Sequence, residues 1–230
     1  MAETLTSTAL FSIVLTLGAY ELGIFLQKKL KSPICNPILI AVIVVIAVLA
    51  LTGIAPRDYQ AGCETFSWLL TPATVCLAVP LYEQVKVLKK NLPAIFAGVL
   101  AGTAVSLACV AVLCRVFAME EAMLASLLPK SITTAMGIAI SEQLGGISAV
   151  TTAVIIVTGI LGNIFGSTLC RLFKLEGPIA QGVAFGTASH VVGTSRASEI
   201  SELTGAVSSL SLVVAGILTA VLCPALFSVL

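Results

Sequence analysis

Five long apolar runs dominate this sequence and restrict the folds that are open to it. They cover residues 5–25, 34–54, 92–116, 147–169 and 207–229, and each is long enough to cross a lipid bilayer as a helix. Hydrophobic residues make up 58% of the 230 positions and charged residues only 10%, too few to cover the surface of a soluble domain. The sequence therefore predicts an all-α polytopic membrane protein embedded in a lipid bilayer. The net charge of +1 indicates no nucleic-acid partner.

Three shorter apolar segments are broken by proline or glycine. Residues 66–82 contain Pro72 and Pro80, residues 122–143 contain Pro129 and Gly137, and residues 179–203 contain Gly182, Gly186 and Gly193. Interrupted membrane helices often form the binding sites of transporters, so we predict that the last two segments are interrupted or re-entrant. Interfacial loops are the alternative. The total is about seven or eight membrane segments in a single domain, residues 1–230.

The lysines predict which side of the membrane each end of a segment faces. Lys28, Lys29 and Lys31 follow the first apolar run, and Lys86, Lys89 and Lys90 precede the run at 92–116. Because positively charged loops stay in the cytoplasm, we predict that the N-terminus lies outside. The topology after Val116 depends on whether the two broken segments cross the membrane or turn back.

A short pattern recurs along the chain. "SEQLGGISA" begins at Ser141 and "SELTGAVSS" at Ser201, and each follows a broken segment and precedes a long apolar run. Internal duplication of transporter halves leaves such similarity. Chance is the other explanation, because membrane proteins draw on few residue types.

The first broken segment reads "LLPKSITTAMGIAISEQLGG" and carries a cation beside hydroxyl groups. Pro129 interrupts a helix, and Lys130, Ser131, Thr133 and Thr134 follow it. A helix that restarts here would direct free N–H groups at an anion, and Lys130 would add a full positive charge. The alternative is that Lys130 extends from the end of a span to the lipid headgroups.

The second broken segment, "FGTASHVVGTSRASE", has a similar chemistry. Gly186 and Gly193 are predicted to break the backbone, while hydroxyl groups come from Thr187, Ser189 and Thr194. His190, the only histidine, and Arg196 supply a protonatable nitrogen and a cation. Packing for His190 and interfacial anchoring for Arg196 are the alternatives. Two cations among hydroxyls in two breaks favour a site for a small anion.

Other chemistries lack a sequence signature. The seven cysteines form no C-x-x-C pair and the single histidine belongs to no H-E-x-x-H motif, so no metal site is expected. There is no phosphate-binding G-x-x-x-x-G-K-[ST] motif and no G-x-S-x-G nucleophile motif. We therefore expect neither a cofactor nor an enzymatic activity.

At both broken segments the sequence resembles the LrgB/CidB family of bacterial membrane proteins. "LPKSITTAMGIAISEQLGGI" resembles that family's P-K-S-V-T-T stretch, and "GVAFGTASHVVGTSRASE" resembles its G-T-A-S-H-x-x-G-T-x-R-A segment. "NPILIAV" and "AYELG" match in place, so the resemblance covers nearly the whole chain. The sequence departs from the family pattern at Ala135, Met136 and Gly137, where a proline is expected after the paired threonines.

The resemblance implies two functions. Bacterial members are described as holin-like or antiholin-like proteins that modulate murein hydrolase export and cell lysis with an LrgA/CidA-like partner. Similar proteins carry small carboxylates, as a plastidal glycolate/glycerate transporter does, and bacterial relatives are linked to pyruvate. For this chain we expect the bacterial cytoplasmic (inner) membrane and an oligomer.

The residues themselves favour the carrier of a small monocarboxylate such as glycolate, glycerate or pyruvate. We predict that Lys130 and Arg196 attract the carboxylate and that His190 donates a hydrogen bond or carries a proton. The predicted hydrogen-bonding hydroxyl groups belong to Ser131, Thr133, Thr134, Thr187, Ser189 and Thr194. A protein that only assembles in the membrane would not need charges beside broken helices.

Overall fold

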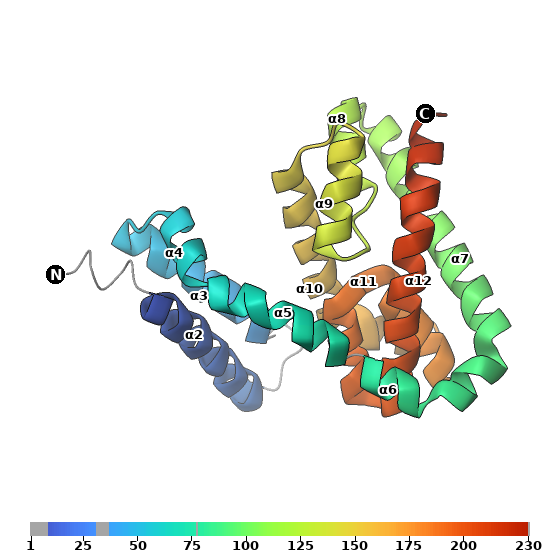
Figure 1. The fold of residues 1–230 in the computed structure, drawn as a ribbon, viewed down its shortest axis with the longest axis horizontal. Helices are drawn as coiled ribbons and strands as arrows, with labels where there is room; N and C mark the ends of the chain where they lie inside the picture. The colour runs from blue at the N-terminus through green and yellow to red at the C-terminus, as the bar shows by residue number, and fades with distance from the viewer. Residues whose placement is uncertain (1–8, 31–36, 77, 230) are drawn as a thin grey trace. The chain divides into compact units, whose positions relative to one another are not determined.

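The protein is described from a computed structural model that covers residues 9–30, 37–76 and 78–229. Within these ranges every regular element is a helix, as predicted (Figure 1). The chain forms two compact units, Met1–Cys76 and Leu77–Leu230, and each is described by itself. The predicted starts of the first two apolar runs, and Lys31, lie outside the described residues.

The described residues of the first unit, 9–30 and 37–76, form four helices. These are α2 (Ala9–Leu30), α3 (Pro37–Thr52), α4 (Pro56–Gly62) and α5 (Glu64–Cys76). Helix α2 packs against α3 and α4. The Thr16 and Tyr59 hydroxyl oxygens lie 2.6 Å apart and join α2 to α4. Gly62 of α4 packs directly on the buried Ser12 side chain.

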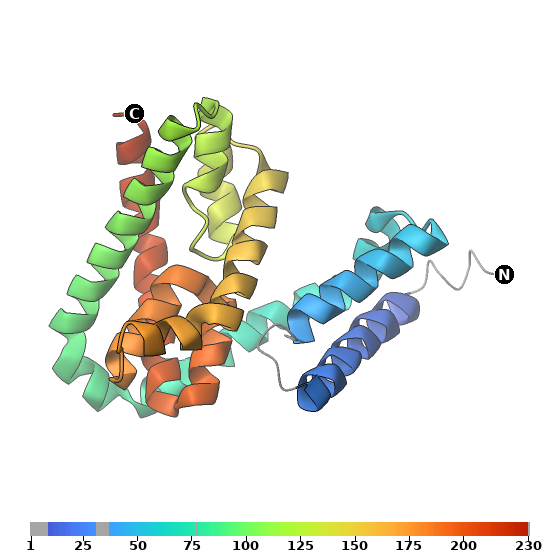
Figure 2. The same cartoon turned by 180° about the vertical axis from the view of Figure 1, so that it is seen from behind.

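The second unit contains the two broken segments and three long helices. Its elements are α6 (Ala78–Glu83), α7 (Val85–Val116), α8 (Glu121–Leu127), α9 (Thr134–Gln143), α10 (Ser148–Leu172), α11 (Pro178–Ile200) and α12 (Glu202–Phe227). Helix α11 packs most extensively on α12 and also contacts α10 and α7. The α8–α9 pair lies beside α10, as the two opposite views show (Figures 1 and 2).

In the described part of the chain, four helices are long and apolar enough to cross a membrane: α2, α7, α10 and α12. Each corresponds to one of the predicted apolar runs. The fifth run corresponds to α3, a shorter apolar helix of 16 residues. Helix α7 begins at Val85 rather than at residue 92, so Lys86, Lys89 and Lys90 lie in its first turns and Pro93 lies inside it.

The first broken segment is interrupted next to the predicted proline. Helix α8 ends at Leu127, α9 begins at Thr134, and Pro129 lies in the non-helical turn between them. After α9 the chain returns to α8. The Ser126 hydroxyl oxygen of α8 accepts a 2.7 Å hydrogen bond from the backbone N–H of Ile147, the residue before α10.

The second broken segment is interrupted at residues that the sequence did not indicate. Helical backbone geometry is lost at Ser189 (φ −133°, ψ 15°) and at His190, which has a positive φ of 43°. The prediction that Gly137, Gly186 and Gly193 break the backbone was wrong, since all three lie inside helices.

These glycines instead allow neighbouring atoms to approach closely. A Cβ atom at Gly186 would lie 2.8 Å from the Ser211 Cβ of α12, and one at Gly193 would lie 2.9 Å from the Phe185 carbonyl oxygen. At Gly137 it would overlap the Ile155 side chain of α10. Tight packing offsets the poor helix propensity of glycine at these positions.

The order of elements recurs, but the matched residues do not adopt the same local structure. A broken segment precedes a long helix twice, as α8–α9 before α10 and as α11 before α12. Ser141, however, lies in the last turns of α9, whereas Ser201 is the N-cap of α12 and accepts a hydrogen bond from the Thr204 N–H. The residue-by-residue match between "SEQLGGISA" and "SELTGAVSS" therefore does not extend to the backbone.

Two apolar clusters form most of the core of the second unit, and they occur in the same order along α7 and α12. The first contains Leu88, Ile95, Val99, Ala206, Val207 and Ala215. The second contains Leu107, Val110, Ala111, Cys114, Leu124, Leu128, Ile132, Ile140 and Cys223. Thr103 of α7 and Thr219 of α12 each lie between the two clusters in sequence, so a polar layer separates two apolar ones.

Candidate functional site

The turn between α8 and α9 positions a cation that has no carboxylate partner. Lys130 is half-buried, and its Nζ donates a 3.1 Å hydrogen bond to the Ser131 hydroxyl oxygen. Among the described residues, no carboxylate lies within ion-pair distance of Lys130. A charge that is removed from water without an opposite charge is costly, so this site favours an anion or water beside Lys130.

Ser131 connects Lys130 to a small pocket that contains residues from both broken segments. The hydroxyl pocket, as we call it, presents the hydroxyl groups of Thr103, Ser106, Ser131, Thr187 and Thr219. Its apolar walls are Leu107, Leu128, Ile132 and Ala215. The Ser106 and Ser131 hydroxyl oxygens lie 3.2 Å apart. The structure thus brings together Ser131 and Thr187, two residues predicted from separate motifs.

The hydroxyl pocket is closed in this conformation. Its cavity volume is about 10 Å³, roughly the space that one water molecule needs by this measure. A carboxylate ligand would therefore require α7, α11 or α12 to move away from the turn at residues 128–133.

His190 lies at the break in α11 and contacts α10. The backbone there has a positive φ of 43°, which is unfavourable for a residue with a Cβ atom. The buried ring lies against Gly159, and its Nε2 is 2.8 Å from the Ile155 carbonyl oxygen. Because a carbonyl can only accept, Nε2 carries the proton and donates this hydrogen bond. His190 therefore holds the break in α11 against the backbone of α10.

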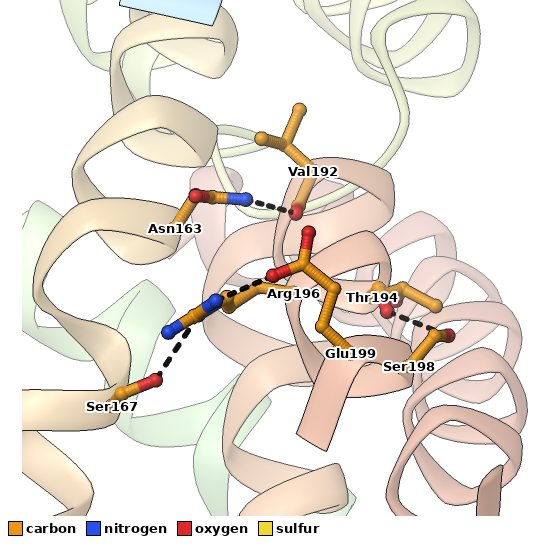
Figure 3. Close-up of polar contacts among 7 residues, drawn as sticks. All are labelled: Asn163, Ser167, Val192, Thr194, Arg196, Ser198 and Glu199. Atoms are coloured by element: carbon orange, nitrogen blue, oxygen red, sulfur yellow. Dashed lines mark hydrogen bonds and ion pairs between the residues drawn. The ribbon is translucent and has the colours of Figure 1, made fainter. Parts of the chain in front are cut away.

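Arg196 of α11 reaches Ser167 of α10 and Glu199 of its own helix, which occupy two of its three donor nitrogens (Figure 3). Its Nη1 forms an ion pair with Glu199, and its Nε donates a 3.3 Å hydrogen bond to the Ser167 hydroxyl oxygen. The Arg196 side chain is 37% exposed and does not line the hydroxyl pocket. The structure does not pair Arg196 with Lys130 at this pocket.

The other predicted hydroxyls lie in different places. Thr194 is buried, donates a 2.9 Å hydrogen bond to the His190 carbonyl oxygen and lies 2.8 Å from the Ser208 hydroxyl of α12. Ser189 packs against Gly162 of α10. Thr133 is the N-cap of α9 without a side-chain capping bond, and Thr134 is the first residue of that helix. Neither of these two threonines lines the hydroxyl pocket.

Three lining residues were missed by the sequence reasoning: Thr103, Ser106 and Thr219. They lie in long apolar runs, which the sequence predicts only as membrane-spanning helices. A signal was present for Thr103, because the buried face of α7 places it one helical turn from Val99 and one from Leu107. A threonine in the middle of a core-facing stripe indicates a buried polar contact.

A larger, apolar groove lies between α10 and α11. It has a volume of about 620 Å³ and is lined mainly by apolar side chains, among them Leu161, Phe165, Leu169, Phe173 and Phe185. No cluster of metal-ligating side chains occurs in the part of the chain that the structure describes.

Comparison with known proteins gives one consistent result. The model of the LrgB-like family matches residues 16–229, so it spans both compact units. The holin-like protein CidB of Staphylococcus epidermidis is 38% identical over 218 residues, which is 95% of each chain. CidB of Staphylococcus aureus is also 38% identical over 218 residues and 95% of each chain. The antiholin-like protein LrgB of Bacillus subtilis is 34% identical over 220 residues, again 95% of each chain. No solved structure matches this chain.

Proposed function

This chain belongs to the LrgB-like family, and from that premise we propose that it acts as a holin-like or antiholin-like protein of the bacterial membrane. In this role it modulates murein hydrolase export and cell lysis together with an LrgA/CidA-like membrane partner. The observation that carries this proposal is the similarity to proteins named holin-like CidB and antiholin-like LrgB over 95% of each chain. The relatives' names support this role better than they support a carrier.

The protein is a multi-pass bacterial membrane protein, as its four apolar helices and its bacterial relatives indicate. We propose that it lies in the cytoplasmic (inner) membrane with its N-terminus outside and forms an oligomer. In this arrangement about seven or eight segments enter the bilayer, and α8–α9 and α11 are the interrupted ones. The apolar surfaces of α2, α7, α10 and α12 then face lipid or a partner helix.

A second function, the transport of a small monocarboxylate, is favoured by one specific observation. Lys130 is half-buried without a carboxylate partner and donates to Ser131, which lines a pocket of five hydroxyl-bearing residues. An assembly role has no need of a cation in this position, whereas a carboxylate carrier does. In this second proposal, glycolate, glycerate or pyruvate binds near Lys130 after the pocket opens.

The two functions are distinguished by reconstituting the purified protein in vesicles. One measurement follows uptake of radiolabelled glycolate and pyruvate, with and without a pH gradient, and a parallel one follows release of an entrapped dye. Dye release without saturable uptake supports the holin-like role. Saturable uptake without dye release, abolished in Lys130→Ala, supports the carrier.

The partner's role is tested in the same vesicles. If neither signal appears with the chain alone, the LrgA/CidA-like partner is added at equal amounts, and dye release is expected to appear. Absence of both signals with the partner present would contradict both functions.

A further inference from the structure

We propose that Thr103, Ser106 and Thr219 form a wall of the carboxylate-binding site, and that the hydroxyl pocket is this site in its closed conformation. The inference rests on the carrier function proposed above and extends it to α7 and α12. Lys130 supplies the positive charge, and the hydroxyl groups orient the ligand and replace its water.

The position of the pocket in the second unit is the first argument. Along α7 the buried residues run from Val99 in one apolar cluster to Leu107 in the other, with Thr103 and Ser106 between them. Along α12, Thr219 lies between Ala215 and Cys223 in the same way. A hydroxyl layer therefore crosses the core at one level, where α7, α12 and both broken segments meet.

The second argument is an unpaired buried oxygen. The Thr103 Oγ1 atom is buried and has no hydrogen-bond partner among the described residues. Buried hydroxyl groups nearly always have a partner in the protein or in bound solvent. Because Thr103 lines the pocket, a molecule that enters the pocket can supply the missing hydrogen-bond partner.

The third argument is the direction of the hydrogen bonds. The Lys130 ammonium group can only donate, so Ser131 accepts from it and can pass its own proton to Ser106. The Ser106 O–H is then free to donate to a ligand. Thr187 donates its own O–H to the Val183 carbonyl oxygen at 2.7 Å, so its lone pairs remain as acceptors. The pocket thus offers donors near Lys130 and an acceptor on α11.

The cavity volume of the hydroxyl pocket shows that the structure represents its closed conformation. A cavity of about 10 Å³ holds one water molecule and excludes a carboxylate of two or three carbons. Binding therefore requires an open conformation in which water reaches Thr103 and Thr219. That requirement can be measured independently of transport.

The test measures access of water to single cysteines. Thr103→Cys and Thr219→Cys are introduced into a variant in which the seven native cysteines are replaced and which retains the elution profile of the parent. Each protein is reconstituted and treated with N-ethylmaleimide, which reacts with thiolates that water stabilises. Ser209→Cys is the matched control, because Ser209 is buried in α12, donates to the Gly205 carbonyl of its own helix and does not line the pocket.

We expect Thr103→Cys and Thr219→Cys to react at least about tenfold faster than Ser209→Cys, since only water-accessible thiolates are reactive. We also expect millimolar glycolate to slow both reactions and to leave Ser209→Cys unchanged. Equal rates at all three positions would overturn the inference. Fast labelling that neither glycolate nor pyruvate slows would also overturn it, because the pocket would then admit water without binding a carboxylate.

Uptake by the unmodified protein separates this inference from the function on which it rests. If the wild type takes up glycolate and Thr103→Val raises the KM while Ser209→Ala does not, the carrier function and the assignment of the pocket wall both stand. If the wild type takes up glycolate but Thr103→Val and Thr219→Val leave the KM and kcat unchanged, the carrier stands and the inference fails. If the wild type takes up no carboxylate and glycolate protects no cysteine, both fail.

Discussion

At the scale of single residues, the strained His190 backbone depends on a glycine of the neighbouring helix. A Cβ atom at Gly159 would lie 2.5 Å from the His190 Cε1 atom and 2.6 Å from Nε2. The ring cannot move away without losing its 2.8 Å hydrogen bond to the Ile155 carbonyl oxygen. We therefore expect Gly159→Ala to destabilise the protein by about 1–3 kcal/mol, the usual cost of an overpacked core. Thermal unfolding in detergent, followed by circular dichroism, measures this loss.

Gly18→Ala is the control for that substitution. Gly18 also lies inside a long apolar helix, but nothing lies within 4 Å of a Cβ atom built there. Since alanine is the better helix former, the variant should unfold at the same temperature as the wild type or higher. Equal effects of Gly159→Ala and Gly18→Ala would show that the His190 contact does not constrain α10.

Thr194 and Ser208 form a buried hydroxyl pair whose two members are not equivalent. Thr194 donates its only hydroxyl proton to the His190 carbonyl oxygen, so Ser208 must donate to Thr194. Thr194→Val removes both interactions and leaves the Ser208 O–H without its acceptor, at a cost of about 1–3 kcal/mol. Ser208→Ala removes only one donor and should cost less.

A double-mutant cycle on unfolding temperatures checks this order. Adding Ser208→Ala to Thr194→Val should cost little, because the proton that Thr194→Val left unpaired is then absent. Strictly additive effects would show that the two hydroxyl groups are not coupled and would contradict the hydrogen bond between them.

For the candidate site, the sequence predicts which residues take part better than it predicts how their side chains are arranged. A cation beside a proline is unusual in an apolar run, and this pattern predicts Lys130 and Ser131 as candidates. The hydroxyl-rich motif around Thr187 predicts that residue in the same way. Arg196 was placed with Lys130 from charge alone, and the structure instead pairs it with Glu199, three residues along α11. A contact between side chains on one helix face is local and could have been anticipated from the spacing.

At the scale of elements, a serine of α8 fixes the connection between α9 and α10. The Ser126 hydroxyl group donates a 2.6 Å hydrogen bond to the Ala122 carbonyl oxygen and accepts a hydrogen bond from the Ile147 backbone N–H. Ser126→Ala leaves that backbone N–H without its acceptor, which costs about 1–3 kcal/mol at a buried site. We expect a lower unfolding temperature and faster hydrogen exchange at residues 144–148, measured by mass spectrometry.

Ser148→Ala provides the comparison. Its hydroxyl group donates a 2.7 Å hydrogen bond to the Glu142 carboxylate on the exposed surface. Contacts on the surface contribute about 0.5 kcal/mol or less to the free energy of unfolding. The unfolding temperature should therefore fall clearly for Ser126→Ala and hardly for Ser148→Ala. A larger effect from Ser148→Ala would mean that the surface contact holds the connection.

The two interruptions differ in how far sequence could predict them. Pro129 removes a backbone donor and clashes with the preceding turn, so a break near it follows from covalent structure. The break at Ser189 and His190 has no such local cause. It is held by contacts with α10, through Ile155 and Gly159, and these are set only when the helices pack. The glycines of α11 were mistaken for its cause, although they serve close packing.

At the scale of the whole molecule, composition predicts a membrane protein but does not predict that the chain divides into two compact units. Long apolar runs and few charges are sufficient to predict membrane helices, and four of those runs became helices of spanning length. The two compact units, Met1–Cys76 and Leu77–Leu230, were not predicted, because the boundary falls within a proline-containing apolar segment rather than in a polar linker. Tertiary contacts, which a single sequence does not reveal, decide such a boundary.

We propose a membrane orientation for the second unit from two observations taken together. By the positive-inside rule, Lys86, Lys89 and Lys90 favour a cytoplasmic start of α7, and on this proposal α7 ends outside. The start of α10 lies beside α8, since the backbone N–H of Ile147 donates to the Ser126 hydroxyl oxygen. We therefore propose that the α8–α9 segment turns back without crossing the membrane, and in this proposal α10 carries Arg171 and Lys174 back to the cytoplasm. The basic residues at both places are consistent with this arrangement.

Fusions of alkaline phosphatase, which is active only outside the cytoplasm, measure this orientation. We expect activity for fusions after Arg57 and after Glu120, and none for fusions after Lys90 and after Lys174. Because the lysines set the orientation, replacing Lys86, Lys89 and Lys90 with glutamine should raise the activity of the fusion after Lys90. Activity after Lys174 in the unsubstituted chain would mean that the α8–α9 segment crosses the membrane, and the predicted positions of α10, α11 and α12 would then be inverted.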